Sequence, residues 1–219
     1  MTISKETLPS LARGIISLQR RGCVCTAALA QGVDWMDEDA HIYERELRVL
    51  SDTYLNDFSL KPVEPLLTRP LYGIGTEQLQ TKFCGSGGGM VTYDIDGRVY
   101  PCHMFTPLVL GKDKACELTN CDLCDTTTIE DPDCKGCSYV SWCPTCYGFN
   151  YCLRGDAKRR DHGWCRMIDV QVRVSCEFQI KYYHKRLHEI GQIDAGQVRV
   201  AVRLARMIKK GEIHVGGQV

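Results

Sequence analysis

Residues 134–146 read CKGCSYVSWCPTC, which is two Cys-x2-Cys pairs separated by five residues. A Cys-x2-Cys turn can aim two thiolates at one ion or cluster while its backbone amides hydrogen-bond the sulfurs. A third pair, Cys121-x2-Cys124, precedes this stretch. Single cysteines flank the pairs at Cys84, Cys102, Cys116, Cys152 and Cys165. This pattern favours metal ligation, and it leaves structural zinc and iron–sulfur ligation both open because both accept four thiolates.

The composition describes a globular chain in a reducing compartment. The 219 residues are 44% hydrophobic and 25% charged, which fits one or two domains. Basic and acidic residues both number 27, so no net field would recruit nucleic acid or an acidic membrane. Fourteen cysteines without an export signal are hard to explain as disulfides, and no stretch reaches the roughly 18 apolar residues that span a bilayer. We therefore expect a cytoplasmic protein with no nucleic-acid partner and no membrane partner.

Residues 1–80 alternate between strand and helix patterns. The sequence predicts, in order, a short strand at Met1–Ile3, a helix over Glu6–Arg21 capped by Ser4 and ended by Gly22, a buried strand at Cys23–Leu29, and a helix over Asp37–Leu55. This order is typical of parallel strands covered by helices, which is the α/β class. Two strands do not make a stable sheet, so we expect further strands upstream.

Residues 81–166 concentrate glycine, cysteine and turn residues. Two β-like runs, Met90–Asp94 and Arg98–Tyr100, are joined by an Asp-Gly dipeptide that signals a hairpin. The hairpin would bring Cys84 and Cys102 to the same end of a two-stranded unit. Residues 167–219 show helical spacing with a basic, solvated face. The chain thus divides into parts at 1–80, 81–166 and 167–219.

Three of these segments together resemble a known family. The segments are CGSGGGMVTYDIDGRVYPCHMF (84–105), DPDCKGCSYVSWCPTCYGFNY (131–151) and GWC (163–165). They resemble the SPASM domain, the auxiliary-cluster domain at the C-terminus of many radical SAM enzymes that modify ribosomally made peptides. Residues 1–80 similarly resemble the last strands and helices of a radical SAM partial (β/α) barrel. The resemblance implies a barrel remnant, a small cysteine-rich SPASM domain with a β-hairpin, and a helical tail.

The resemblance also implies which cysteines bind metal. Four of them, Cys134, Cys137, Cys143 and Cys165, would bind one [4Fe–4S] cluster, and Cys84, Cys102 and Cys146 would bind a second. The remaining ligand of the second cluster would be an open position or one of Cys116, Cys121, Cys124 and Cys152. The family pattern has three residues between its last paired cysteines, whereas this chain has two. One or two clusters are therefore expected, with a role in relaying electrons and contacting substrate.

The catalytic half of such an enzyme is not in this sequence. Radical SAM enzymes bind their catalytic cluster through C-x3-C-x2-C, and the chain contains no such triplet. We therefore assign no catalytic residues, and S-adenosylmethionine would enter only through a separate radical SAM chain. The other partners that the resemblance implies are a ribosomally made precursor peptide and an electron carrier such as ferredoxin or flavodoxin.

Two other interpretations of the cysteines stay open. A structural zinc-binding interaction module would use a compact four-ligand set, for which Cys121, Cys124, Cys134 and Cys137 are suitable. A truncated fragment without independent activity is the other interpretation. Acid-labile sulfide would indicate iron–sulfur ligation, and tightly bound colourless metal would indicate zinc.

Overall fold

The computed structural model describes residues 1–76, 84–116, 123, 130–186 and 192–216, with only the backbone for 192–194. The chain mixes many helices with few strands. The elements in chain order are β1 (Thr2–Ile3), η1 (Leu8–Ser10), α1 (Leu11–Arg20), β2 (Ala28–Leu29), α2 (Asp37–Asn56), β3 (Thr92–Tyr93), β4 (Val99–Tyr100), η2 (His103–Phe105), α3 (Pro107–Leu110), α4 (Lys112–Cys116), η5 (Pro132–Cys134), α5 (Tyr147–Arg154), α6 (Gly163–Lys185) and α7 (Gln192–Lys210). None of the helices described here is both long enough and apolar enough to cross a membrane.

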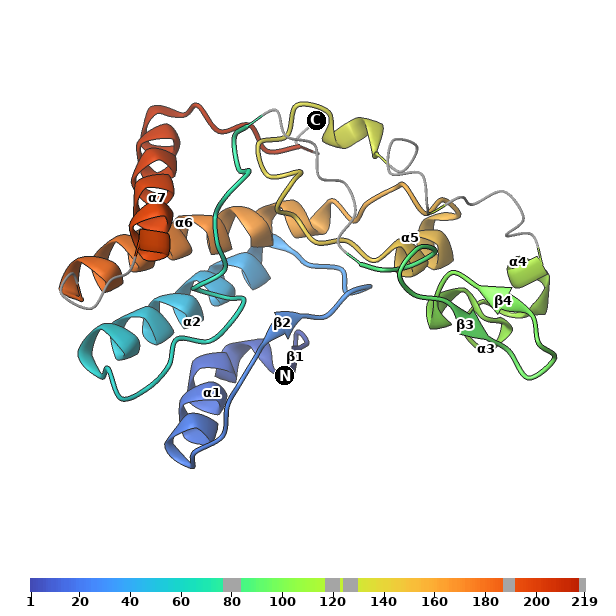
Figure 1. The fold of residues 1–219 in the computed structure, drawn as a ribbon, viewed down its shortest axis with the longest axis horizontal. Coiled ribbons are helices and arrows are strands. Elements are labelled where there is room, and N and C mark those ends of the chain that lie inside the picture. Colours follow the sequence, from blue (N-terminus) through green and yellow to red (C-terminus); the bar gives the residue numbers. More distant parts are fainter. Residues whose placement is uncertain (77–83, 117–122, 124–129, 187–191, 217–219) are drawn as a thin grey trace.

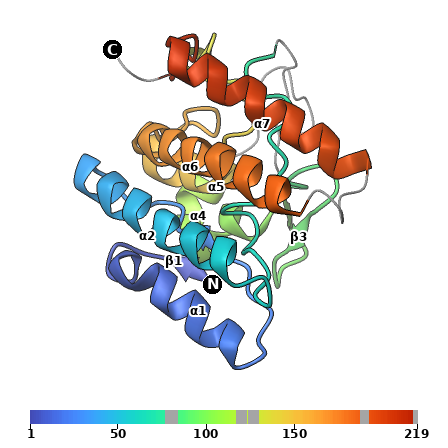
Figure 2. The same cartoon turned by 90° about the vertical axis from the view of Figure 1, so that its left-hand side faces the viewer.

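Four helices stack in layers and enclose the main hydrophobic core. Figure 2 shows α1, α2, α6 and α7 lying one above the other, and α6 packs against both α2 and α7. The core takes Leu11 from α1, Leu47 from α2, Phe178 from α6 and Leu204 from α7. Elements from both ends of the chain therefore share one core.

The helix boundaries follow from local chemistry. The Asp39 carboxylate accepts a hydrogen bond from the Met36 backbone N–H at 2.9 Å, which satisfies a free donor before α2. Gly22, with φ of +83°, follows the end of α1 as the sequence predicts. The prediction that Ser4 caps this helix is wrong, because Ser4 forms a separate turn with Thr7 and the 3₁₀ helix η1 intervenes.

The first two strands form a parallel pair, in agreement with the α/β pattern. In this pair Thr2 lies opposite Ala28, and Ile3 lies opposite Leu29. The predicted buried strand at Cys23–Leu29 is wrong in its first half, since Val24 is 93% exposed and regular pairing begins only at Ala28. The strands that the structure describes form this pair and one hairpin, so no barrel is present among the described residues.

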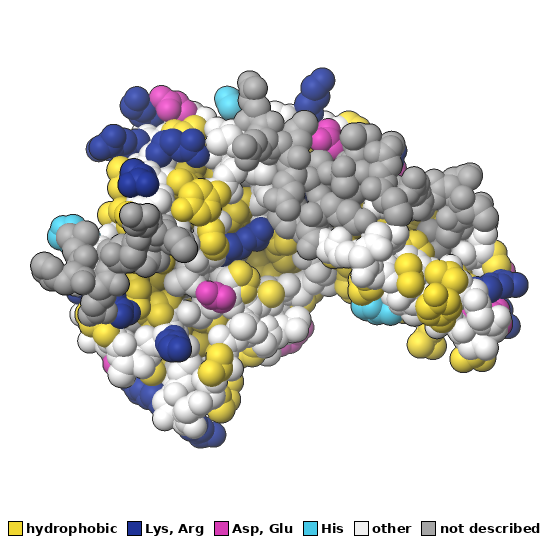
Figure 3. Space-filling model, in the orientation of Figure 1, with side chains coloured by type: hydrophobic (Ala, Val, Ile, Leu, Met, Phe, Trp, Pro, Cys, Tyr) yellow, Lys and Arg dark blue, Asp and Glu magenta, His cyan; other side chains and the backbone are white. Residues whose placement is uncertain are grey.

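A hairpin and short helices form a second, smaller unit at the other end of the molecule (Figure 1). The hairpin prediction is confirmed: β3 and β4 are antiparallel, and Gly97 adopts a φ of +81° in the turn between them. A small core joins this hairpin to α5 through Tyr100, Phe105 and Tyr147. The outer surface here is apolar, because Tyr93, Ile95 and Val99 are exposed, and Figure 3 shows hydrophobic side chains gathered at this end.

The part of the chain expected to be a separate helical tail is continuous with the cysteine-rich region. The expected division between residues 166 and 167 lies inside α6, which begins at Gly163. Gly163 lies close to the loop between β2 and α2, since a Cβ there would lie 3.0 Å from the Trp35 carbonyl oxygen. The cysteine-rich region is therefore anchored directly to the main core.

Candidate metal centre

The first of two cysteine groups consists of Cys134, Cys137, Cys143 and Cys165. Cys134 ends η5, the Cys137 N–H donates to the Cys134 carbonyl at 3.0 Å, and Cys165 lies in the first turn of α6. The pKa of the Cys134, Cys143 and Cys165 thiols is raised to about 12, mainly by burial, and neighbouring thiols of the group contribute to the rise of each. The structure thus brings together the four cysteines of one implied ligand set.

Arg160 places a positive charge inside this group. Its residue exposure is 4%, and its Nη1 donates to the carbonyls of Val140 at 3.4 Å and Cys143 at 3.3 Å. Its guanidinium lowers the pKa of the Cys134, Cys143 and Cys165 thiols, against the larger effect of burial. A buried charge is costly unless opposite charge compensates it. Arg160 therefore offsets part of the cost of thiolate charge in this group, while burial keeps the metal-free thiols neutral.

The five-residue spacer between the two pairs is fixed to the main core. Tyr139 and Trp142 are both buried there. The Tyr139 hydroxyl donates to Asp169 on α6 at 2.7 Å, and the Trp142 indole donates to the Pro70 carbonyl at 2.8 Å. Buried aromatic side chains with satisfied polar atoms hold a loop rigidly, so this spacer positions the cysteines on either side of it.

The C-terminal segment covers the same turn. The Ser138 N–H donates to the His214 carbonyl at 2.8 Å. A Cβ added at Gly216 would lie 3.1 Å from the Cys137 Cβ and 3.4 Å from the Cys134 Cα. Glycine at this position therefore lets the segment approach the cysteine turn closely.

The second group consists of Cys84, Cys102 and Cys146, from opposite ends of the cysteine-rich region. Burial raises the pKa of the Cys146 thiol, the N–H groups of Phe149 and Gly148 at the start of α5 lower it, and the thiols of Cys102 and Cys84 raise it. Cys102 is buried, whereas Cys84 is exposed. The structure therefore also brings together the three cysteines of the second implied set.

A glycine turn holds the first two members of this group together. The Gly87 N–H donates to the carbonyl of Pro101, the residue before Cys102, at 2.9 Å. Gly87 has a φ of +79°, and a Cβ there would lie 2.9 Å from the Leu123 Cβ. Only glycine combines this conformation with this contact.

Two of the four candidates for the remaining ligand of the second group, Cys116 and Cys152, are among the described residues. Cys116 is exposed at the end of α4, with its Sγ 3.6 Å from Arg98 Nη1. Cys152 is half-buried in α5 against the smaller core. Cys121 and Cys124 lie outside the described residues.

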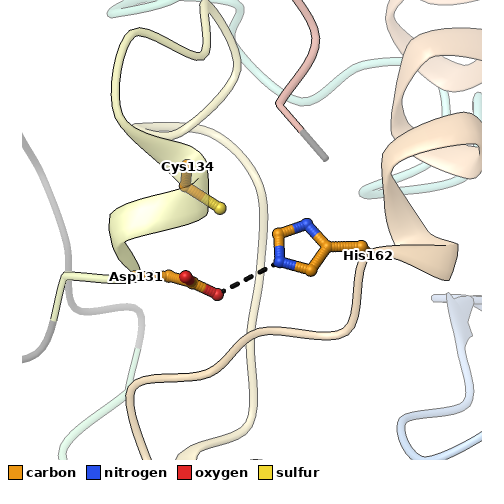
Figure 4. Close-up of side chains that lie close together, drawn as sticks. All are labelled: Asp131, Cys134 and His162. Carbon is orange, nitrogen blue, oxygen red and sulfur yellow. Dashed lines mark ion pairs between the residues drawn. The ribbon is translucent and has the colours of Figure 1, made fainter. Parts of the chain in front are cut away.

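A compact set of different ligands lies at the edge of the first group. The ligand atoms of Asp131, Cys134 and His162 all lie within 4.8 Å of one another, as Figure 4 shows. Asp131 is the N-cap of η5 and His162 is the N-cap of α6. Among the residues that the structure describes, this mixed set, and no set of three cysteines, meets that distance.

The sequence analysis missed Asp131, Arg160 and His162. A signal was present, because Asp131 stands three residues before Cys134 and His162 stands three residues before Cys165. Polar residues so close in sequence to a metal-binding thiol can orient that thiol through hydrogen bonds. Arg160 gave no such signal, because the sequence does not distinguish it from its neighbour Arg159. In the structure Arg160 is buried and Arg159 is exposed.

Comparison of the chain with protein-family models, with curated proteins and with solved structures gave no match. The cysteine groups themselves therefore carry the functional interpretation.

Proposed function

We propose that this chain binds [4Fe–4S] clusters through its two cysteine groups, as the C-terminal part of a radical SAM peptide maturase with a SPASM-type domain. The observation that carries the proposal is the sorting of seven scattered cysteines into one group of four and one group of three. These groups match the two ligand sets that the sequence resemblance implies.

The spacing within the first group supports a cluster over a single zinc ion. Four thiolates around one zinc ion lie about 3.8 Å from one another, given a Zn–S distance of about 2.3 Å. Among the described residues no three cysteine sulfurs lie within 4.8 Å of one another. A four-iron cluster is larger than one ion, so it suits thiols that are close enough to raise one another's pKa but too far apart to share one zinc ion.

The charges near the groups also suit a bound cluster. A thiolate-bound [4Fe–4S] cluster exchanges one electron at a potential set by charge, hydrogen bonds and burial. Arg160 would offset the negative charge of the thiolates in the first group. The backbone N–H groups at the start of α5 would do the same for Cys146.

The two groups would have different tasks. The first group offers four thiolates and is fixed to the main core, which suits electron relay to a carrier such as ferredoxin or flavodoxin. The second group offers three described thiols, one of them on the exposed Cys84, which suits an iron site reached by a precursor peptide. A separate radical SAM chain would supply S-adenosylmethionine chemistry.

Metal analysis after anaerobic reconstitution tests the proposal. We expect about eight irons and eight acid-labile sulfides per chain, with a low-temperature EPR signal on reduction. Cys143→Ser and Cys84→Ser should each lower the iron content to about four per chain, because each removes a ligand of one group. The exposed Cys23 lies in neither group, so Cys23→Ser is the matched control and should retain all the iron.

Stoichiometric zinc without sulfide would refute the proposal. The proposal would also be refuted if Cys143→Ser and Cys84→Ser contained as much iron as Cys23→Ser, because the iron would then be bound elsewhere.

A further inference from the structure

The mixed set of Asp131, Cys134 and His162 has the geometry of a single-metal site. His162 Nε2 lies 3.3 Å from Asp131 Oδ2, and the Cys134 sulfur lies within 4.8 Å of both ligand atoms. Two light-atom ligands of a tetrahedral zinc ion lie about 3.3 Å apart, given metal–ligand distances of about 2.0–2.1 Å. The separation of Nε2 and Oδ2 matches one edge of such a tetrahedron.

The carboxylate of this set is held in place before any metal arrives. Asp131 Oδ1 accepts a hydrogen bond from the Asp133 N–H at 3.0 Å, and Oδ2 accepts one from the Arg160 N–H at 2.7 Å. The Asp131 side chain is only 1% exposed. A buried carboxylate that two backbone N–H groups already orient loses little conformational entropy when it binds a metal.

The histidine is oriented as metal-binding histidines are. Its Nε2 faces Asp131 and Cys134, while its Nδ1 lies 3.8 Å from the Cys165 sulfur. A ligating histidine usually presents its other ring nitrogen to a hydrogen-bonding partner, which fixes the ring. The His162 side chain is 30% exposed, so the ring also offers a path by which an ion can enter from solvent.

We propose that Asp131, Cys134 and His162 bind one divalent ion of the zinc type, in a site that excludes a cluster in the first cysteine group because both need Cys134. One sulfur, one imidazole nitrogen and one carboxylate oxygen form a donor set that zinc accepts, with water in the fourth position. The three ligands lie together whether or not the chain binds iron–sulfur clusters, and a cluster in the first group would displace the ion by taking Cys134.

Two substitutions separate the single-metal site from the cluster site. Cys143→Ser removes a cluster ligand and leaves the mixed set intact, so it should abolish the first cluster and retain Zn²⁺. His162→Ala removes a ligand of the mixed set and leaves the four cysteines intact, so it should retain iron and lower Zn²⁺ affinity by more than about tenfold. The matched control is His184→Ala, at the exposed last turn of the same helix, and it should change neither.

The measurements are Zn²⁺ competition with a chelator and X-ray absorption of the full apo chain loaded with one equivalent of Zn²⁺. We expect one sulfur at about 2.3 Å and nitrogen or oxygen ligands at about 2.0–2.1 Å. Four sulfurs in the first shell would overturn the inference and assign the zinc to cysteines. Equal Zn²⁺ affinity in His162→Ala and wild type would overturn it as well. If the wild-type chain bound no iron but still bound Zn²⁺ through one sulfur, the cluster proposal would be refuted and the zinc-site inference would be supported.

Discussion

Replacing Gly148 by alanine tests whether close packing behind Cys146 holds the second cysteine group together. Gly148 is the second residue of α5, and an added Cβ would lie 2.2 Å from the Met104 Cβ and 3.5 Å from the Met104 Cα. Non-bonded carbons prefer about 3.5–4.0 Å, so η2 and α5 must separate by more than about 1 Å. The Met104 Cβ is fixed by its backbone, and rotation of the side chain cannot relieve this contact. We expect the overpacking to destabilise the chain by about 1–3 kcal/mol.

Gly14 provides the matched control, since it is also a helical glycine. A Cβ there would lie 3.6 Å from the end of the Met1 side chain, which is an ordinary contact. Gly14→Ala should therefore stabilise the chain by up to about 1 kcal/mol, through helix propensity alone.

Urea unfolding of the reduced apo chain measures both effects. With a slope of about 2 kcal/mol per M, Gly148→Ala should lower the midpoint by about 0.5–1.5 M and Gly14→Ala should raise it slightly. Hydrogen exchange should place the loss of protection in α5 and η2. After reconstitution, Gly148→Ala should also lose iron from the group that contains Cys146. An unchanged or raised midpoint in Gly148→Ala would refute the close contact between α5 and η2.

Three further predictions concern the first cysteine group. Arg160→Met should lower the reduction potential of a cluster there by about 50–150 mV, the effect of removing one nearby charge at an effective dielectric constant of about 20. EPR-monitored titration checks this, with the exposed Arg159→Met as control, and an equal shift in both variants would contradict it. Because burial raises the pKa of the Cys134, Cys143 and Cys165 thiols to about 12, metal uptake near neutral pH must displace their protons. Metal affinity should therefore rise up to about tenfold per pH unit for each proton displaced, and chelator competition showing a flat pH dependence would count against this. Removing metal should increase hydrogen exchange in the spacer between the two Cys-x2-Cys pairs and leave α1 unchanged, whereas uniform protection in both states would oppose a structural role for the metal.

The local elements of the fold were largely predictable because they depend on neighbouring residues. The end of α1 needed only Gly22, and the hairpin turn needed only its Asp-Gly dipeptide. The strand expected at Cys23–Leu29 failed because an apolar run does not specify burial, and the chain exposes Val24. The layering of α6 on α2 depends on contacts between residues far apart in sequence, so periodicity alone did not give it.

The two sets of thiols that lie together are those that the resemblance implies, but neither the resemblance nor the cysteine spacing predicted the polar groups around them. Asp131 and His162 belong to the site only because η5 and the start of α6 meet in space. Arg160 is buried while Arg159 is exposed, and only the packed structure distinguishes these two adjacent residues. Charge within a site therefore depended on tertiary contacts that no local pattern encodes.

The position of Cys165 connects metal binding to the stability of the main core. Cys134 ends the short η5 and Cys137 and Cys143 lie in the loop that follows, whereas Cys165 lies on α6 between the buried residues Trp164 and Met167. Any ion or cluster that binds Cys165 together with the other three cysteines connects η5 and the loop after it to the longest helix that the structure describes. The free energy of metal binding then adds to the free energy of unfolding, because the unfolded chain does not preform the site. In the second group only Cys102 belongs to a hydrophobic core that the structure describes, and that core is the smaller one, so this group should be the first to lose its metal as the chain is destabilised.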